Sequence, residues 1–265
     1  MRVRNGLTLV ELLVVVGIIA LLLGILLPAL GKARLAAKAA VDLANIHNLE
    51  QAHWMYMLDN NGAFIRVGLA HGGMHTDEQS MWLTTLSLYW GNHTHDASPV
   101  DGVVRNNLKA RSPLDTSPHW QTSGGGTSGG TPGTPVPNSG GQYRRTSYGI
   151  NDFLDTSVCP WGGPYHLNKV PRPAATVHFL IMAFEGDFAG ADHPHVENWT
   201  GSKPPLKAAK QVQINAAGGP DASWESVSNY GYLDGHAATV PFRTVFTHVS
   251  SDPSSVNQFD PIVAQ

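Results

Sequence analysis

The chain has 265 residues, of which 42% are hydrophobic and 14% charged, and its formal net charge at pH 7 is −3. This balance gives no basic footprint for nucleic acid, so no nucleic-acid partner is expected. The single cysteine, Cys159, excludes an intrachain disulfide.

The first thirty residues join a short basic leader, residues 1–6, to a long apolar segment. No charged side chain occurs from Leu12 to Leu30. About 20 apolar helical residues span the hydrocarbon core of a membrane, so residues 7–30 are predicted to form a transmembrane helix. Arg2 and Arg4 precede it, which predicts a cytoplasmic N-terminus. A cleaved secretory signal, which has a shorter apolar core, and a simple anchor helix are the alternatives.

Glu11 interrupts the start of this apolar segment. A carboxylate at the edge of a membrane span is costly and usually has a partner. In one interpretation Glu11 is merely hydrated at the level of the lipid headgroups. In the other, cleavage after Gly6 frees the amine of Leu7, which pairs with Glu11 of an adjacent copy of the helix. Such a pair would fix the axial register, since either charge alone in lipid would be costly.

The helix is predicted to continue beyond the membrane, so that the whole of residues 7–62 forms one element. Residues 33–52 are rich in good helix formers, and Asp59-Asn60-Asn61-Gly62 is typical of a helix end. Pro28 is expected to kink the helix or open a few hydrogen bonds, because it lacks an N–H donor. The second half of the helix should pack on a soluble head.

The segment Gly6-Leu7-Thr8-Leu9-Val10-Glu11-Leu12 resembles the processing motif of type IV pilins and type II secretion pseudopilins. The resemblance implies that a prepilin peptidase cuts after Gly6 and that Leu7 is then methylated. It also implies that Glu11 serves subunit recruitment and stacking. The family usually has Phe after the glycine, so Leu7 is a departure, but the spacing of glycine and glutamate is kept.

Residues 63–265 are predicted to form one α+β head, with a long loop at 121–142 that is rich in Gly, Ser, Thr and Pro and is expected to be mobile. A short helix is predicted within Met81–Trp90. Asp234-Gly235 predicts a two-residue hairpin turn. The predicted strands are Val177–Phe184, Gln211–Ile214, Asn229–Leu233 and Ala238–Val245.

Three head segments resemble the pilin-like proteins abundant in planctomycetes, whose C-terminal signature ends in Asp-Gly-His. They are Met55–Gly62, Ser147–Asn151 and Tyr230–Ala237. Trp224 stands where that subfamily often has a histidine, and Arg111–Asp115 stands where it has a Cys-Pro segment. The resemblance implies a pilin-like fold in which a long N-terminal helix, transmembrane in its first half, lies on an antiparallel β-sheet head with long loops.

Histidine pairs raise the question of a metal site, although no compact ligand spacing occurs. His193 and His195 would share one face of an extended segment, with Asp192 and Glu197 beside them. Imidazole and carboxylate groups suit zinc. Scattered surface histidines are the alternative, here and for the pair His93 and His95.

Calcium is the other cation considered. Asp234, with Asp187 or Asp221, could supply the oxygen ligands that calcium prefers. No Asp-rich loop matches a calcium-binding pattern, and a turn-forming role for Asp234 is favoured. The sequence thus predicts no resident cofactor, with calcium or another metal at these residues as the alternative.

No enzyme is predicted. The chain has no nucleophile elbow, no P-loop and no dinucleotide-binding fingerprint. Tryptophans of the head could instead stack on sugars if they were exposed, and would otherwise fill the core.

The resemblance implies a structural subunit that assembles through its N-terminal helix into a type IV pilus or a type II secretion pseudopilus. Its partners would be other pilin subunits, the prepilin peptidase, an inner-membrane assembly platform and membrane lipid. It would reside in the bacterial inner membrane as a single-pass protein, with the head outside the cytoplasm, before entering a periplasmic or cell-surface filament. The alternative is a minor or membrane-resident pilin-like protein whose head binds a ligand, a sugar or a secreted substrate.

Overall fold

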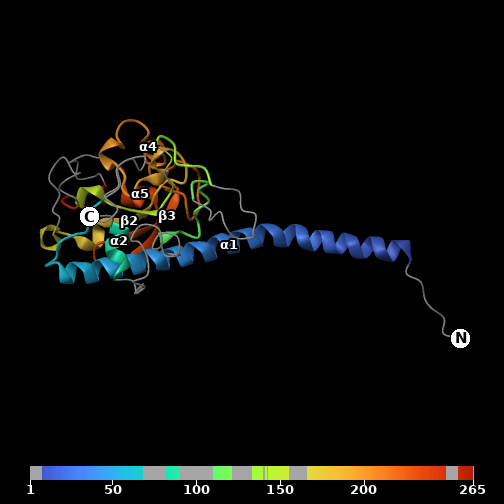
Figure 1. Ribbon diagram of the computed structural model, residues 1–265. Helices are drawn as coiled ribbons and strands as arrows, with labels where there is room; N and C mark the ends of the chain where they lie inside the picture. Colours follow the sequence, from blue (N-terminus) through green and yellow to red (C-terminus); the bar gives the residue numbers. More distant parts are fainter. Residues whose placement is uncertain are drawn as a thin grey trace.

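The computed structural model describes residues 8–67, 82–89, 110–120, 133–139, 141, 143–154, 166–248 and 256–264. It has a long helical stalk that carries a head at its C-terminal half (Figure 1). Gly6, Leu7, His93, His95 and Cys159 lie outside the described residues, as does most of the loop predicted at 121–142.

Helix α1, Leu9–Asp59, is continuous for 51 residues and includes Pro28 in its interior. Every residue from 8 to 38 is exposed, whereas burial begins at Asp42. The buried residues of α1 are Asp42, Ile46, Leu49, Glu50, Ala52, His53 and Met57. They recur at the three- and four-residue spacing that forms one helical face, so only the C-terminal half of α1 packs on the head.

The head is built on one antiparallel sheet in the order β1-β2-β3-β4. The strands are β1 Tyr148–Ile150, β2 Val177–Ile181, β3 Val227–Tyr232 and β4 Ala237–Pro241. Together with the N-terminal helix, this sheet confirms the α+β, pilin-like fold class. Strand β1 was not predicted from the sequence, whereas β2 and β3 lie within or beside predicted strands.

Two layers cover the sheet, one on each face. On one face α1 and the short helix α2, Trp82–Ser87, enclose a core that includes Ile46, Leu49, Trp82 and Phe179. On the other face lie α4, Pro204–Ala208, and α5, Phe242–Val245, on the side away from α1 (Figure 1). Trp199 is completely buried there, with its ring 5.2 to 5.8 Å from those of Phe242, Phe246 and Phe259.

The remaining named elements of the described residues are single 3-10 turns. They are η3 Asp152–Leu154, η4 Leu167–Lys169, η5 Pro173–Ala175, η6 Asp187–Gly190 and η7 Val196–Asn198. The turns position side chains at the end of β1 and along the edges of the sheet.

Two predicted strands are wrong in whole or in part. Gln211–Ile214 makes one isolated bridge, between Met182 and Val212, and the Gln211 side-chain oxygen accepts hydrogen bonds from the Trp199 ring and the His195 N–H. Ala238–Val245 forms β4 and then helix α5. Phe242 and Val245 are three residues apart and both completely buried, so a helical turn brings both into the core where a strand would expose one.

The turn between β3 and β4 contains Asp234 and Gly235, but its loop has three residues where two were predicted. The Gly235 N–H donates to the Tyr232 carbonyl at 2.8 Å, and the Tyr232 N–H donates to the His236 carbonyl at 2.9 Å. Gly235 has φ +96°, which suits glycine at the last position of a three-residue hairpin loop. Leu233, the first loop residue, is completely buried beside Met57 of α1.

Candidate functional site

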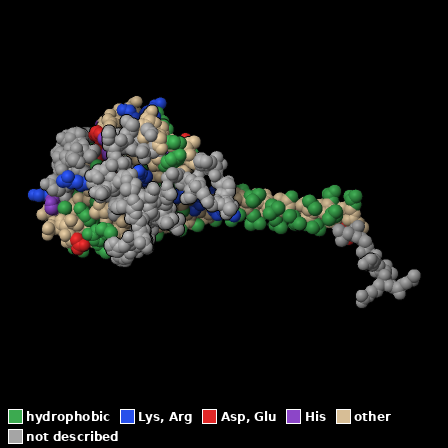
Figure 2. Space-filling view, in the orientation of Figure 1, with side chains coloured by type: hydrophobic (Ala, Val, Ile, Leu, Met, Phe, Trp, Pro, Cys, Tyr) green, Lys and Arg blue, Asp and Glu red, His purple; other side chains and the backbone are tan. Residues whose placement is uncertain are grey.

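The free half of α1 is an almost unbroken apolar surface. Large hydrophobic side chains cover it from Leu9 to Leu30, and each is at least 47% exposed. Figure 2 shows this surface as a hydrophobic rod that projects from the mixed polar and charged surface of the head. The helix is long and apolar enough to cross a membrane. We refer to residues 9–30 as the apolar stalk.

Glu11 closes the N-terminal end of the stalk with a capping box. Its Oε2 accepts hydrogen bonds from the Thr8 N–H and the Thr8 hydroxyl, both at 2.8 Å. The Glu11 N–H donates in turn to Thr8 Oγ1 at 3.2 Å. The two residues thus satisfy backbone donors that a helix start leaves unpaired. Glu11 therefore has a local partner, and its carboxylate points to the helix end.

Two fully buried carboxylates, Asp42 and Glu50, attach the C-terminal half of α1 to the sheet. Asp42 accepts hydrogen bonds from the Tyr148 hydroxyl of β1 and from Asn229 Nδ2 of β3, both at 2.7 Å. Burial raises the pKa of Asp42. Because both oxygens have partners, the helix is fixed in rotation and in height against two strands at once.

Glu50 binds β2 at an irregularity in its pairing with β3. The register shifts between Val177 and Leu180, and in this stretch His178 and Phe179 both contact the α1 side. Glu50 Oε2 lies 2.9 Å from His178 Nδ1, and Glu50 Oε1 accepts the Phe179 N–H at 3.3 Å. The carboxyl group thus satisfies a backbone donor at the bulge.

The Glu50–His178 pair is neutral as a unit. Burial raises the pKa of Glu50 well above its usual value and lowers the pKa of His178 to about 3. Both shifts oppose charge in the core. One shared proton between the two side chains leaves no net charge, which is why the pair can be buried.

His53 packs against this pair, with its ring 4.1 Å from the ring of His178 and tilted by 32°. Its Nε2 accepts the Ile65 N–H at 3.3 Å, and its buried Nδ1 makes no hydrogen bond. Burial, followed by the nearby His178, lowers the pKa of His53 well below its usual value. The side chain is therefore neutral and joins the end of α1 to the segment that follows it.

Gly231 of β3 lies against α1 at a point of close approach. A methyl group there would overlap Glu50 Oε1 and lie 2.8 Å from Ile46 Cγ2. The close approach explains why this position of the chain requires glycine.

Gly231→Ala is expected to destabilise the chain by about 1–3 kcal/mol through overpacking. The measurement is the denaturant midpoint of the full chain in detergent, followed by tryptophan fluorescence. Gly17→Ala is the matched control, because a methyl group at this exposed helical position meets nothing within 4 Å. Equal midpoints for the two variants would contradict the close approach.

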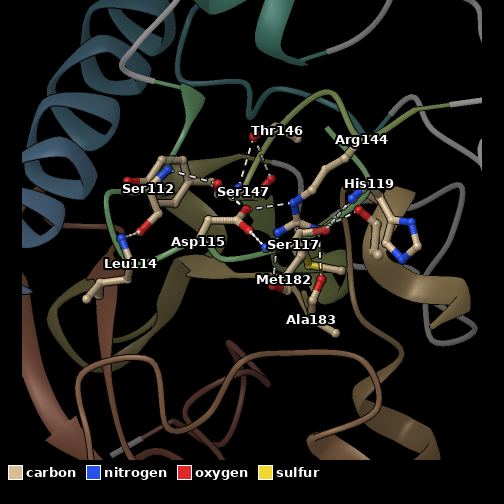
Figure 3. Close-up of polar contacts among 12 residues, drawn as sticks. Ser112, Leu114, Asp115, Ser117, His119, Arg144, Thr146, Ser147, Met182 and Ala183 are labelled. Carbon is tan, nitrogen blue, oxygen red and sulfur yellow. Dashed lines mark hydrogen bonds and ion pairs between the residues drawn. The ribbon is translucent and has the colours of Figure 1, made fainter. Parts of the chain in front are cut away.

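A buried ion pair joins separate segments of the head. Arg144 Nε donates to Asp115 Oδ2 at 2.7 Å, and neither side chain is exposed (Figure 3). Arg144 also donates to the carbonyls of Met182, Ala183 and Ala189. Burial lowers the pKa of Arg144. One guanidinium therefore joins residues 110–120, the end of β2 and η6.

Both carboxylate oxygens of Asp115 accept hydrogen bonds. Its Oδ2 also accepts the Ser147 hydroxyl at 2.6 Å, and its Oδ1 accepts the Ser117 N–H at 2.7 Å. The ion pair and these hydrogen bonds thus cross-link residues 110–120 to the segment that contains Arg144 and Ser147.

A second cluster lies at the end of β1, where η3 meets η7. His195 Nδ1 lies 2.8 Å from Glu197 Oε1 and 3.9 Å from Asp152 Oδ2. His193 lies beside them, with its ring 5.3 Å from that of His195 and its Nδ1 2.9 Å from Asp192 Oδ1. The structure thus brings together the second histidine pair and both flanking carboxylates.

Three side chains of this cluster have shifted pKa values. Burial and the charge of Glu197 raise the pKa of Asp152 to about 7. The hydrogen bond with Glu197 raises the pKa of His195. Although burial acts in the opposite direction, the hydrogen bond with His195 lowers the pKa of Glu197. Sequence reasoning missed Asp152, since no motif connects it to residues more than forty positions away.

Asp234 and Asp187 do not form a common site within the described residues. Asp234 Oδ1 accepts the His236 N–H at 3.1 Å and lies 2.5 Å from His236 Nδ1, so it closes the hairpin turn. Asp187 accepts Asn138 Nδ2 at 2.9 Å. In this part of the chain two groups have metal-ligand spacing, namely Glu50 with His53 and His178, and Asp152 with His195 and Glu197.

The described tryptophans do not form an exposed stacking surface. Trp82 and Trp199 are completely buried, and Trp54, Trp120 and Trp224 are half-buried. Trp90 and Trp161 lie outside the described residues. Trp82, Trp199, Trp54 and Trp224 belong to or pack against the core clusters of the head, whereas the Trp120 ring lies against Arg111 and Arg144.

Comparison with known proteins relates part of the chain to a family model and to a pilus component. Residues 1–27 match the family described as the prokaryotic N-terminal methylation motif. The chain is also similar to the type IV wide pilus major component PilA4 of Thermus thermophilus, with 40% identity over 75 residues. That alignment covers 26% of this chain and 57% of the relative, so the chain spans less than two thirds of the relative's length. No solved structure matches the chain.

Proposed function

We propose that the chain is a type IV pilin-like filament subunit which assembles through α1, and its match to the N-terminal methylation motif and its similarity to a type IV pilus component support this proposal. The observation that carries this proposal is the apolar stalk, exposed along its whole length and closed at one end by Glu11. A large apolar surface that a folded chain leaves exposed, as on the apolar stalk, needs lipid or a second protein surface to cover it.

The proposed route has three steps. The stalk first spans the inner membrane, with the head outside the cytoplasm and the basic leader inside. A prepilin peptidase then cuts after Gly6, and the new amine at Leu7 is methylated. An assembly platform finally moves the subunit out of the membrane, and the stalks of neighbouring subunits cover one another.

In this proposal Glu11 has two roles at different stages. Within the single subunit it caps α1 through Thr8. In the filament its carboxylate pairs with the Leu7 amine of a neighbouring subunit and sets the axial step. The pairs of Asp42 and Glu50 with the sheet keep the head at a fixed height on the stalk, so a step between stalks becomes an equal step between heads.

The test is the N-terminal residue of the protein recovered from the cells that make it, determined by mass spectrometry, together with its abundance in sheared filaments. A methylated Leu7 and a strong band in the filament fraction are expected. An intact Met1 or a cut beyond Leu30 would overturn the processing route. A methylated subunit that stays in the membrane fraction would favour the alternative, a membrane-resident or minor pilin-like protein whose head binds a ligand.

A further inference from the structure

The cluster at the end of β1 contains two buried carboxylate oxygens that make no hydrogen bond, Asp152 Oδ1 and Glu197 Oε2. The Asp152 side chain is only 2% exposed, so bulk water does not solvate this oxygen. When the carboxyl groups are ionised these oxygens can only accept, and a buried acceptor without a donor or cation is costly. Both oxygens therefore point to a missing positive partner.

We propose that Asp152, His195 and Glu197 bind a divalent transition-metal ion of the zinc type. One ligand atom from each of the three residues lies within 4.8 Å of the others. One imidazole nitrogen with two carboxylate oxygens is a ligand set that zinc accepts, whereas calcium prefers oxygen alone. His195 and Glu197 are each about one-fifth exposed, at 20% and 21%, so the ion has a path from solvent.

The metal takes the place of the proton that now lies between His195 and Glu197. Their side chains are 2.8 Å apart through Nδ1 and Oε1. An imidazole nitrogen that carries a proton cannot act as a ligand, so His195 would bind the ion in its neutral form, through the nitrogen that carries no proton. His193 is the nearest further imidazole, and Asp192 holds its Nδ1. A carboxylate behind a histidine is the arrangement that orients imidazole rings around metals.

The other group of suitable residues, Glu50 with His53 and His178, is a poorer site. All three are completely buried, and Glu50 already binds His178 Nδ1 and the Phe179 N–H. A cation there would break the attachment of α1. The cluster at β1 instead joins η3 to η7, two segments of a head whose sequence allows no intrachain disulfide. This inference goes beyond filament assembly and does not depend on it.

The test is zinc binding by the full chain, purified in detergent without a histidine tag and stripped with a chelator. Isothermal titration with zinc is expected to give one saturable site per chain, and cobalt is expected to give the visible absorption of a tetrahedral site. Glu197→Gln and His195→Gln should each weaken zinc binding by at least about tenfold. Zinc should raise the thermal unfolding midpoint of the unmodified chain and leave those of the two variants unchanged.

Matched controls separate this site from the other histidines and acids of the surface. Glu225→Gln and His236→Gln change an exposed carboxylate and an exposed imidazole outside the cluster and should bind zinc as the unmodified chain does. Circular dichroism without metal verifies that each variant is folded. The proposal is overturned if no saturable site is found, if both cluster variants keep full affinity, or if calcium binds as tightly as zinc.

Discussion

Glu11→Gln is expected to abolish filament formation while leaving cleavage after Gly6 and the fold of the head intact. Glutamine keeps the capping box, because its side-chain oxygen can still accept from Thr8. It removes the negative charge that the proposed pair with the Leu7 amine requires. An unpaired buried ammonium costs roughly 3–5 kcal/mol. Since roughly 1.4 kcal/mol is a factor of ten, assembly should fall by more than about 100-fold.

Thr8→Ala is the complementary variant, because it removes the side-chain cap and keeps the charge of Glu11. Loss of a cap costs about 1 kcal/mol of helix stability. Filaments should therefore still form in this variant. The measurement is the amount of subunit in sheared filaments, relative to the processed subunit in membranes. Normal assembly of Glu11→Gln would show that assembly does not require the charge. If Glu11→Gln assembles and Thr8→Ala does not, the capping box and not the charge is what assembly requires.

Asp115→Asn is expected to destabilise the head by about 3–5 kcal/mol, because it leaves the Arg144 guanidinium buried without its counter-charge. The asparagine amide cannot satisfy both sides of the site. Asp115 accepts Arg144 and Ser147 on one oxygen and the Ser117 N–H on the other. In either orientation of the amide, its NH₂ group faces a donor, so at least one buried donor loses its acceptor.

Glu225→Gln is the matched control for this charge removal. Glu225 also pairs with an arginine, Arg243, but both side chains of that pair are more than half exposed. Exposed pairs contribute between about 0 and 1 kcal/mol, so the control should barely change the free energy of unfolding. Denaturant unfolding of the full chain in detergent measures both. Equal midpoints for the two variants would mean that the buried pair does not hold the head together.

Several elements were predictable because their signals are local. The apolar run up to Leu30, the glycine–glutamate spacing of the processing motif and the Asp234-Gly235 turn can be read within a few residues. The apolar run of β2 and the helix formers of α1 are equally local. These features follow from periods of two or 3.6 residues and from the conformational freedom of glycine.

Other elements were missed because neighbours distant in sequence decide them. Strand β1 contains Gly149, a poor strand former by propensity, yet a side chain there would overlap Met182 and approach the carbonyl of Asp192. Phe242 and Val245 have strand propensity but form a helical turn, because both side chains enter the core below β3. Local preference is weak compared with the burial of large side chains.

The sequence by itself determined the stalk, its processing motif and the α+β class, since each depends on residues close together in the chain. Only the tertiary structure decided which polar groups meet. Glu50 finds His178 across 128 positions, and Asp115 finds Arg144 across 29. It also decided that Asp152 joins His195 and Glu197. Charged groups in a low-dielectric interior must be paired, and the partner is set by the packing of the strands, which leaves no periodic trace in the sequence.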